Sequence, residues 1–156
     1  MKITSYSVNQ TRQWGRRVAS FLQEGDIICL FGGLGSGKTI FTKGIAEGLG
    51  IPASEVISPT FVLLRQYRCG LLPLYHFDFY RLGGHQEILD LGYEEYFYRD
   101  GVTVVEWPQR LGCLLPNEYL KLSFFIKEES VRVISFIPFG KRYKDLVQKL
   151  YANTCN

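Results

Sequence analysis

The sequence lacks the features that mark several common protein classes. Four cysteines occur among 156 residues, and they lie roughly forty residues apart with no C-x-x-C pair, which excludes a zinc knuckle and a compact disulfide framework. No apolar run approaches the length of a membrane span, and no signal peptide opens the chain. We therefore expect a reduced, cytoplasmic protein without a membrane partner.

A large excess of charge of either sign is also absent. The formal net charge is +3 at pH 7, which is too small to predict direct binding of nucleic acid. The basic clusters at 16–17 and 141–149 are typical of solvated helix faces. With 46% hydrophobic and 21% charged residues the composition is globular, and we expect residues 1–156 to form a single domain.

One glycine-rich segment carries the strongest signal in the chain. Residues 32–39 read GGLGSGKT and fit the pattern G-x-x-x-x-G-K-[ST]. An apolar run precedes them and apolar residues at every fourth position follow, so we expect a strand, a glycine loop and a helix. Backbone N–H groups of such a loop bind phosphate oxygens. Lys38 is then expected to bind the β- and γ-phosphates, and Thr39 to give its hydroxyl to Mg²⁺.

The rest of the chain predicts strands and helices around this loop. Ser7 with Gln10 forms a capping-box pattern at the start of a helix. We expect strands at 2–6, 61–67, 71–80, 102–105, 119–126 and 131–138, with helices over 87–91 and near the C-terminus. These elements predict an α/β fold: a three-layer P-loop NTPase-like sheet, partly parallel with added antiparallel strands, and helices on both faces.

Hydrolysis or transfer of a phosphoryl group also needs a carboxylate near Mg²⁺. Glu106 directly follows the strand 102–105, at the strand end where P-loop enzymes carry this carboxylate. We therefore predict that Glu106 holds Mg²⁺ directly or through water. The alternative, an ordinary exposed glutamate after a strand, is weaker because the glycine loop is present.

Three further residues have two interpretations each. Asp78 shares a predicted strand face with His76 and Tyr80. It either acts in catalysis, by orienting the attacking water or by binding a ligand of the metal, or makes a structural bond, for instance to Arg81. His76 alone is more often a satisfied structural histidine than a catalyst. Thr60, in the segment SPT, is either a switch-like residue that senses the γ-phosphate or part of a simple turn.

Four motifs occur in one order along the chain: GGLGSGKT at 32–39, SPTF at 58–61, HFDFYR at 76–81 and VEWP at 105–108. Together they resemble the bacterial TsaE family, the small P-loop ATPases of tRNA threonylcarbamoyladenosine biosynthesis. The resemblance implies ATP and Mg²⁺ as cofactors and the TsaB and TsaD proteins as partners. It implies that the chain contacts tRNA only indirectly, through that assembly, and that it transfers no phosphoryl group to a small-molecule acceptor. ATP hydrolysis, weak in the isolated protein, is then expected to permit repeated turnover of the assembly.

The same resemblance assigns roles to individual residues. Thr60, Asp78 and Glu106 are the catalytic candidates, Thr39 and Glu106 the metal ligands, and Trp107 lies beside them. The candidate nucleotide-binding residues in the loop are Gly35, Ser36, Gly37, Lys38, Thr39 and Ile40. Apart from the resemblance, we expect the adenine in a pocket between the stretch 8–11 and the hairpin near Arg132, which adds Val8, Thr11 and Arg132 as candidates. Two loop positions depart from the family pattern, in which Asp and Ala are common where Gly33 and Ser36 stand here. Neither position supplies the core phosphate contacts, which come from backbone N–H groups, but Gly33 loses a possible polar contact and adds backbone freedom to the loop.

Two other functions remain open on the sequence. A small-molecule kinase on the same scaffold needs an acceptor pocket and a lid with paired arginines, and no such lid is apparent. A nucleotide-dependent binding module, in which hydrolysis is incidental, is the second alternative. Missing N-K-x-D and D-x-x-G motifs argue against a GTPase of the Ras kind.

Overall fold

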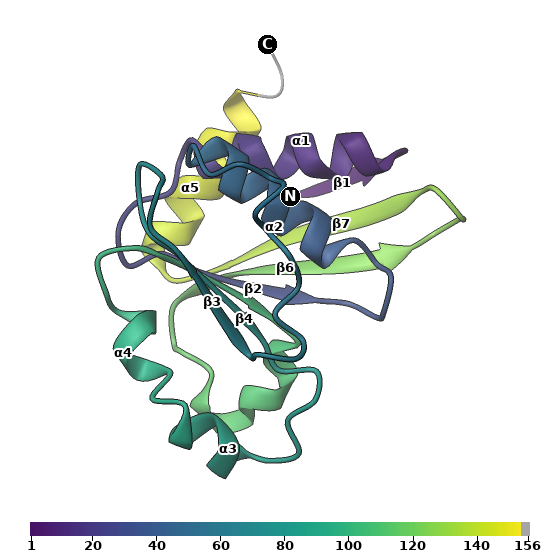
Figure 1. The fold of residues 1–156 in the computed structure, drawn as a ribbon. Coiled ribbons are helices and arrows are strands. Elements are labelled where there is room, and N and C mark those ends of the chain that lie inside the picture. Colours follow the sequence, from purple (N-terminus) through teal and green to yellow (C-terminus); the bar gives the residue numbers. More distant parts are fainter. Residues whose placement is uncertain (154–156) are drawn as a thin grey trace.

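A computed structural model describes residues 1–153, and within them the strands form one mixed sheet (Figure 1). The strand order is β1-β7-β6-β2-β5-β4-β3. The strands are β1 (Lys2–Ser5), β2 (Ile27–Phe31), β3 (Leu64–Tyr67), β4 (Leu74–Asp78), β5 (Val102–Glu106), β6 (Tyr119–Ile126) and β7 (Arg132–Phe139). The helices are α1 (Val8–Ala19), α2 (Lys38–Gly48), α3 (His85–Asp90), α4 (Glu94–Phe97), the 3₁₀-helix η1 (Pro108–Leu114) and α5 (Lys141–Ala152).

The centre of the sheet is parallel. β2 pairs in parallel with β5 and β6, and β4 pairs in parallel with β5, whereas β1, β3 and β7 are joined to the sheet by antiparallel pairing. The carboxyl ends of parallel strands meet at one edge of a sheet. The glycine loop after β2 therefore opens at the same edge as Asp78 and Glu106, which face each other in the register of β4 and β5.

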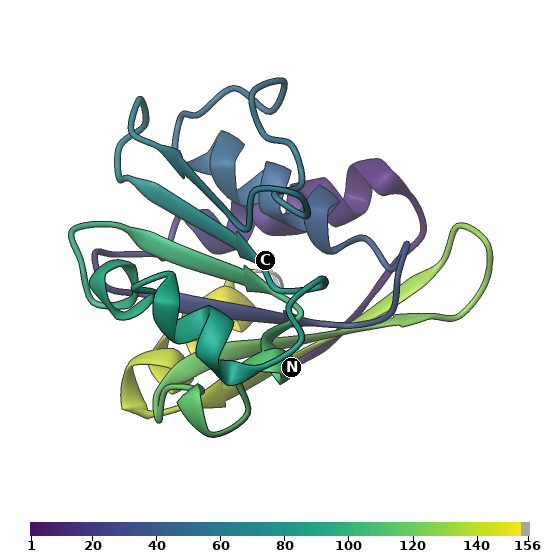
Figure 2. The same cartoon turned by 60° about the horizontal axis from the view of Figure 1, so that its bottom comes forward.

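Helices cover both faces of the sheet and enclose two apolar clusters. One face packs against α1, α2 and α5, through residues that include Val18, Phe41 and Leu146. The other packs against α3, α4 and η1, through residues that include Ile88, Phe97 and Leu111. In Figure 1, α1 and α2 lie above the sheet with α3 and α4 below it, and Figure 2 turns the α3 side forward. The predicted fold class is confirmed.

Helices α1 and α2 approach each other closely because glycines line their contact. A Cβ atom added at Gly44 would lie 2.0 Å from the carbonyl oxygen of Arg12, and one added at Gly15 would lie 2.2 Å from that of Phe41. The start of α1 is capped as predicted, since Ser7 Oγ accepts from the N–H of Gln10 at 3.1 Å. α1 is thus fixed against the helix that begins at the phosphate-binding loop.

Several predicted boundaries were wrong around the third and fourth strands. Residues 61–63 form a turn rather than a strand, because the N–H groups of Val62 and Leu63 both donate to Pro59 O, and Leu63 has a positive φ of 66°. β4 ends at Asp78, whose Oδ1 accepts from the N–H of Tyr80 at 2.9 Å, a turn that side-chain carboxylates favour. Tyr80 therefore does not continue the strand.

Other differences lie outside the site. α3 begins at His85, two residues before the predicted start, and α4 adds a turn of helix where the sequence predicted no element. Among residues 1–153, no helix is both long enough and apolar enough to cross a membrane. Cys29 is buried, Cys69 and Cys113 are exposed, and all three are free thiols; Cys155 lies outside the described residues.

Candidate nucleotide-binding site

The glycine loop wraps around the start of α2 and leaves its first N–H groups free of a side-chain cap. Gly37 is the residue before the helix, has a φ of 103°, and carries no side chain that could cap it. Gly32 lies against β6, and a Cβ atom there would come within 2.9 Å of the carbonyl oxygen of Phe124. Only glycine fits both positions easily. The result is a concave loop at a helix N-terminus, which is the geometry that binds anions.

Lys38 projects from the first turn of α2 back into the loop. Its Nζ donates to Gly32 O and Gly33 O, both at 2.8 Å, and lies 4.4 Å from the centre of the Trp107 ring. Burial lowers the pKa of Lys38 below its ordinary value, while the negative charges of Glu106 and Asp78 act in the opposite direction. The ammonium group is thus held inside the loop by acceptors that a phosphate oxygen could replace.

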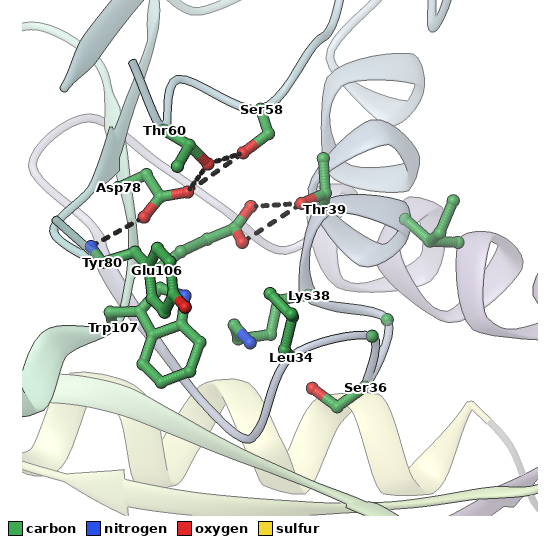
Figure 3. A pocket seen from close by; sticks show the side chains of 13 residues that line it. Leu34, Ser36, Lys38, Thr39, Ser58, Thr60, Asp78, Tyr80, Glu106 and Trp107 are labelled. Atoms are coloured by element: carbon green, nitrogen blue, oxygen red, sulfur yellow. Dashed lines mark hydrogen bonds between the residues drawn. The ribbon is translucent and has the colours of Figure 1, made fainter. Parts of the chain in front are cut away.

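Thr39 and Glu106 meet across the cavity (Figure 3). The hydroxyl of Thr39 donates to Glu106 Oε1 at 2.9 Å and to Oε2 at 3.1 Å. Mg²⁺ in nucleotide sites is held by one or two protein oxygens together with phosphate oxygens and waters. These two side chains supply such oxygens, and no cluster of three or more His, Cys, Asp or Glu side chains occurs in residues 1–153 as an alternative metal site.

Asp78 accepts hydrogen bonds from two hydroxyl groups of the segment between α2 and β3. Its Oδ2 accepts from Thr60 Oγ1 at 2.6 Å and from Ser58 Oγ at 3.0 Å, and the two hydroxyls lie 2.7 Å apart. Arg81 makes no ion pair with Asp78 in the described structure and lies instead 4.1 Å over the ring of Phe61. Asp78 therefore holds the loop that carries Thr60 at the edge of the cavity.

Two adjoining cavities contain all the predicted site residues. The first has a volume of about 270 Å³ and is lined by the glycine loop, Thr60, Asp78, Glu106 and Trp107. The second, of about 340 Å³, is lined by Val8, Thr11 and Arg132 among others. Gly35, Gly37 and Ile40 line both cavities, so a ligand could extend from one to the other around the loop.

Some residues of the site were not foreseen in their present roles. Ser58 and Thr60 both donate to Asp78 Oδ2. The position of Ser58 two residues before Thr60 was the feature of the sequence that could have indicated this role. The buried His76 contacts Glu106, with Nε2 2.9 Å from Oε1; no local pattern in the sequence indicated this pairing, because it depends on β4 lying beside β5. Leu34 also lines the first cavity, at a variable position of the loop motif.

The two unusual loop residues have distinct surroundings. Gly33 contributes its carbonyl oxygen to Lys38, a contact that any residue type could make through its backbone. Ser36 lines the first cavity, and its Oγ is buried without a hydrogen-bond partner among the described residues. A buried hydroxyl of this kind is costly unless it finds an acceptor, and a bound phosphate would supply one.

The fold and the loop place the chain in the P-loop NTPase-like class of α/β proteins. Within that class, the family model described as threonylcarbamoyl adenosine biosynthesis protein TsaE matches residues 5–134. The chain belongs to the TsaE family.

Similar proteins come from several bacterial groups. A tRNA threonylcarbamoyladenosine biosynthesis protein TsaE from Bacillus subtilis is 41% identical over 150 residues, which cover 96% of this chain and 93% of the relative. The protein of the same name from Treponema pallidum is 42% identical over 135 residues, covering 86% and 98%. The crystal structure of YdiB from Bacillus subtilis superposes with a TM-score of 0.85 at 36% identity, covering 99% of this chain and 95% of that one.

Proposed function

We propose that this chain binds ATP with Mg²⁺ and hydrolyses it as the ATPase component of the machinery that forms N6-threonylcarbamoyladenosine beside the anticodon of tRNA. Membership of the TsaE family supports the pathway. The convergence of Lys38, Thr39, Asp78 and Glu106 on one cavity after a glycine loop carries the ATPase part of the proposal. TsaB and TsaD are the proposed partners, with tRNA engaged through them, in the cytoplasm.

The proposed mechanism starts with binding of the phosphates. The N–H groups of residues 35–40 and the Lys38 ammonium receive the phosphate oxygens, and Lys38 exchanges its contacts with Gly32 O and Gly33 O for them. Thr39 and Glu106 hold Mg²⁺, which when bound neutralises charge on the β- and γ-phosphates. The adjoining cavity between Val8 and Arg132 receives the adenine.

Asp78 is proposed to orient the attacking water. A carboxylate has about four acceptor positions, and Ser58, Thr60 and Tyr80 donate to this one. The position that is left is available for a water molecule, and the Thr60 hydroxyl can turn toward it or toward the phosphate. Coupling of this loop to the nucleotide gives the partners a surface that differs before and after hydrolysis.

Reconstitution with TsaB and TsaD tests the proposal. Purified chain, TsaB, TsaD, substrate tRNA, ATP and Mg²⁺ are combined, and modified tRNA and released phosphate are measured in the same sample. We expect this chain to raise both the yield of modified tRNA per assembly and the rate of phosphate release. If it stimulates neither, the proposed function is wrong.

A further inference from the structure

His76 makes a buried contact that the proposed mechanism has not used. It lies in the interior of β4 with its side chain 0% exposed, and its Nε2 is 2.9 Å from Glu106 Oε1. The register of the parallel strands pairs His76 with Val104 and Asp78 with Glu106. The imidazole therefore contacts a carboxylate on the neighbouring strand that lies two positions further along the register, beside Asp78.

The second ring nitrogen argues against a purely structural role. Nδ1 of His76 is buried and has no hydrogen-bond partner among residues 1–153, and an unpaired polar atom in a core is unfavourable. An apolar side chain at this position would avoid that cost. The hydrogen bond to Glu106 is the contact for which an imidazole is needed. In it the ring carries its proton on Nε2 and donates it to the carboxylate.

This bond restricts how the Glu106 carboxylate can turn. Oε1 accepts from His76 on one side and from the Thr39 hydroxyl on the other, while Oε2 also accepts from Thr39. If the Thr39 hydroxyl binds a metal instead of Glu106, the hydrogen bond from His76 is the one that still holds the Glu106 carboxylate. A ligand that is already oriented loses less conformational freedom on binding, and partners of metal ligands commonly act in this way.

We propose that His76 is a positioning residue, which holds the Glu106 carboxylate turned toward Thr39 and the nucleotide cavity and so strengthens binding of the metal–nucleotide complex. The inference rests on the proposed function, because it assumes that Glu106 holds Mg²⁺. It gives a role in the site to a histidine that the sequence alone indicated to be structural.

The experiment compares binding of AMP-PNP, a nucleotide that is not hydrolysed, in Mg²⁺ and in EDTA. Three variants of the full chain are used. His76→Gln keeps an amide N–H at about the reach of Nε2, His76→Asn carries the same amide on a shorter side chain, and His76→Leu removes the donor. We expect Mg²⁺ to strengthen binding to the wild type and to His76→Gln, and this enhancement to fall by about tenfold or more in the other two variants. Affinity in EDTA is expected to stay within about twofold for all of them.

The controls separate folding, positioning and the proposed function. His85→Gln changes the other histidine of the chain, which is exposed, and is expected to match the wild type. Thermal melting of each variant reports its folding, and the Gln and Asn pair decides the matter if His76→Leu does not fold. A folded His76→Asn with the full Mg²⁺ enhancement overturns the inference alone. A wild-type chain that binds no AMP-PNP overturns the proposed function and the inference with it.

Discussion

Single residues of the site are held by bonds within the chain that the proposed nucleotide would replace. Lys38 Nζ donates hydrogen bonds to the carbonyl oxygens of Gly32 and Gly33, and the Thr39 hydroxyl donates to the Glu106 carboxylate. Each of these bonds pairs a buried charge with a neutral group of the chain, so the charges of Lys38 and Glu106 have partners before ligand binding. A phosphate and its metal would offer Lys38 and Glu106 partners of opposite charge in place of these neutral groups. The site is therefore preorganised for the proposed ligand, because Lys38, Thr39 and Glu106 already line one cavity.

The first prediction concerns Lys38. Replacing it by Met keeps much of the side-chain volume and removes the ammonium that we expect to bind phosphate oxygens. Hydrogen bonds to charged groups contribute about 1.5–3 kcal/mol, so ATP binding should weaken by roughly ten- to a hundredfold, measured with a fluorescent ATP analogue. Lys43→Met, on the same helix but outside the lining of either cavity, is the matched control. Equal affinities of the two variants would show that Lys38 does not bind the phosphates.

The second prediction concerns Thr60, whose hydroxyl donates to Asp78 at 2.6 Å. Thr60→Val keeps the shape and removes the hydroxyl, which frees the loop from Asp78 at this point. We expect the rate of ATP hydrolysis to fall by about tenfold or more while ADP affinity changes by less than about twofold. Phosphate release and ADP titration measure the two quantities. A weakened ADP affinity with an unchanged rate would assign Thr60 to nucleotide binding instead.

The helices and strands around the site are fixed by contacts that tolerate little change. Gly15 and Gly44 let the backbones of α1 and α2 touch. At the other end of the sheet, the hydroxyl of Tyr143 in α5 accepts from the N–H of Ile27 at 2.8 Å, at the start of the strand that leads into the glycine loop. Neither contact involves a residue that lines the two cavities, yet both set the position of β2 and α2.

The third prediction concerns the contact between α1 and α2. Gly44→Ala places a Cβ atom 2.0 Å from Arg12 O, so the two backbones must separate. Overpacking of this kind costs about 1–3 kcal/mol, and we expect the free energy of unfolding to fall by that amount in urea titrations. Gly84→Ala is the control, since a Cβ atom there meets nothing within 4 Å. An unchanged stability for Gly44→Ala would contradict the close packing of the helices.

The fourth prediction concerns Tyr143 and pH. Tyr143→Phe leaves the buried Ile27 N–H without its partner, which should lower the free energy of unfolding by about 1–3 kcal/mol near pH 7. Burial raises the pKa of Tyr143, so the folded phenol stays protonated where the unfolded one ionises, above roughly pH 10. The wild type therefore loses stability as pH rises through that range, and the variant lacks this loss.

Urea titrations of both proteins at about pH 8 and about pH 10.5 measure the effect. The gap in stability between wild type and Tyr143→Phe should narrow at the higher pH. A gap that stays constant would mean that Tyr143 ionises equally in the folded and unfolded chains.

The whole molecule brings the site together through the topology of its sheet. Four neighbouring strands, β6, β2, β5 and β4, run parallel, so the segments that follow β2, β4 and β5 share one edge. The second cavity, which we propose receives the adenine, is lined in addition by residues of α1 and of the hairpin between β6 and β7. Residues from Val8 to Arg132 thus meet around one loop, and no shorter part of the chain contains the site.

The sequence predicted much of this arrangement because its signals are local. The glycine loop, the apolar run before it and the cap at Ser7 each act within a few residues. The turn at 59–63 was missed because it depends on two N–H groups sharing Pro59 O, which an apolar segment does not reveal. The contact of His76 with Glu106 was missed because it joins neighbouring strands that are thirty residues apart in the chain.

Turnover of the assembly with Glu106→Ala tests the central claim most directly. The variant is combined with TsaB, TsaD, tRNA, ATP and Mg²⁺, after melting has shown that it is folded, and modified tRNA per assembly is counted against phosphate released. We predict that phosphate release is lost and that modification stops after about one turnover, since the proposed function requires hydrolysis to reset the assembly. Continued modification over many turnovers without phosphate release would contradict the account and leave a binding module whose hydrolysis is incidental.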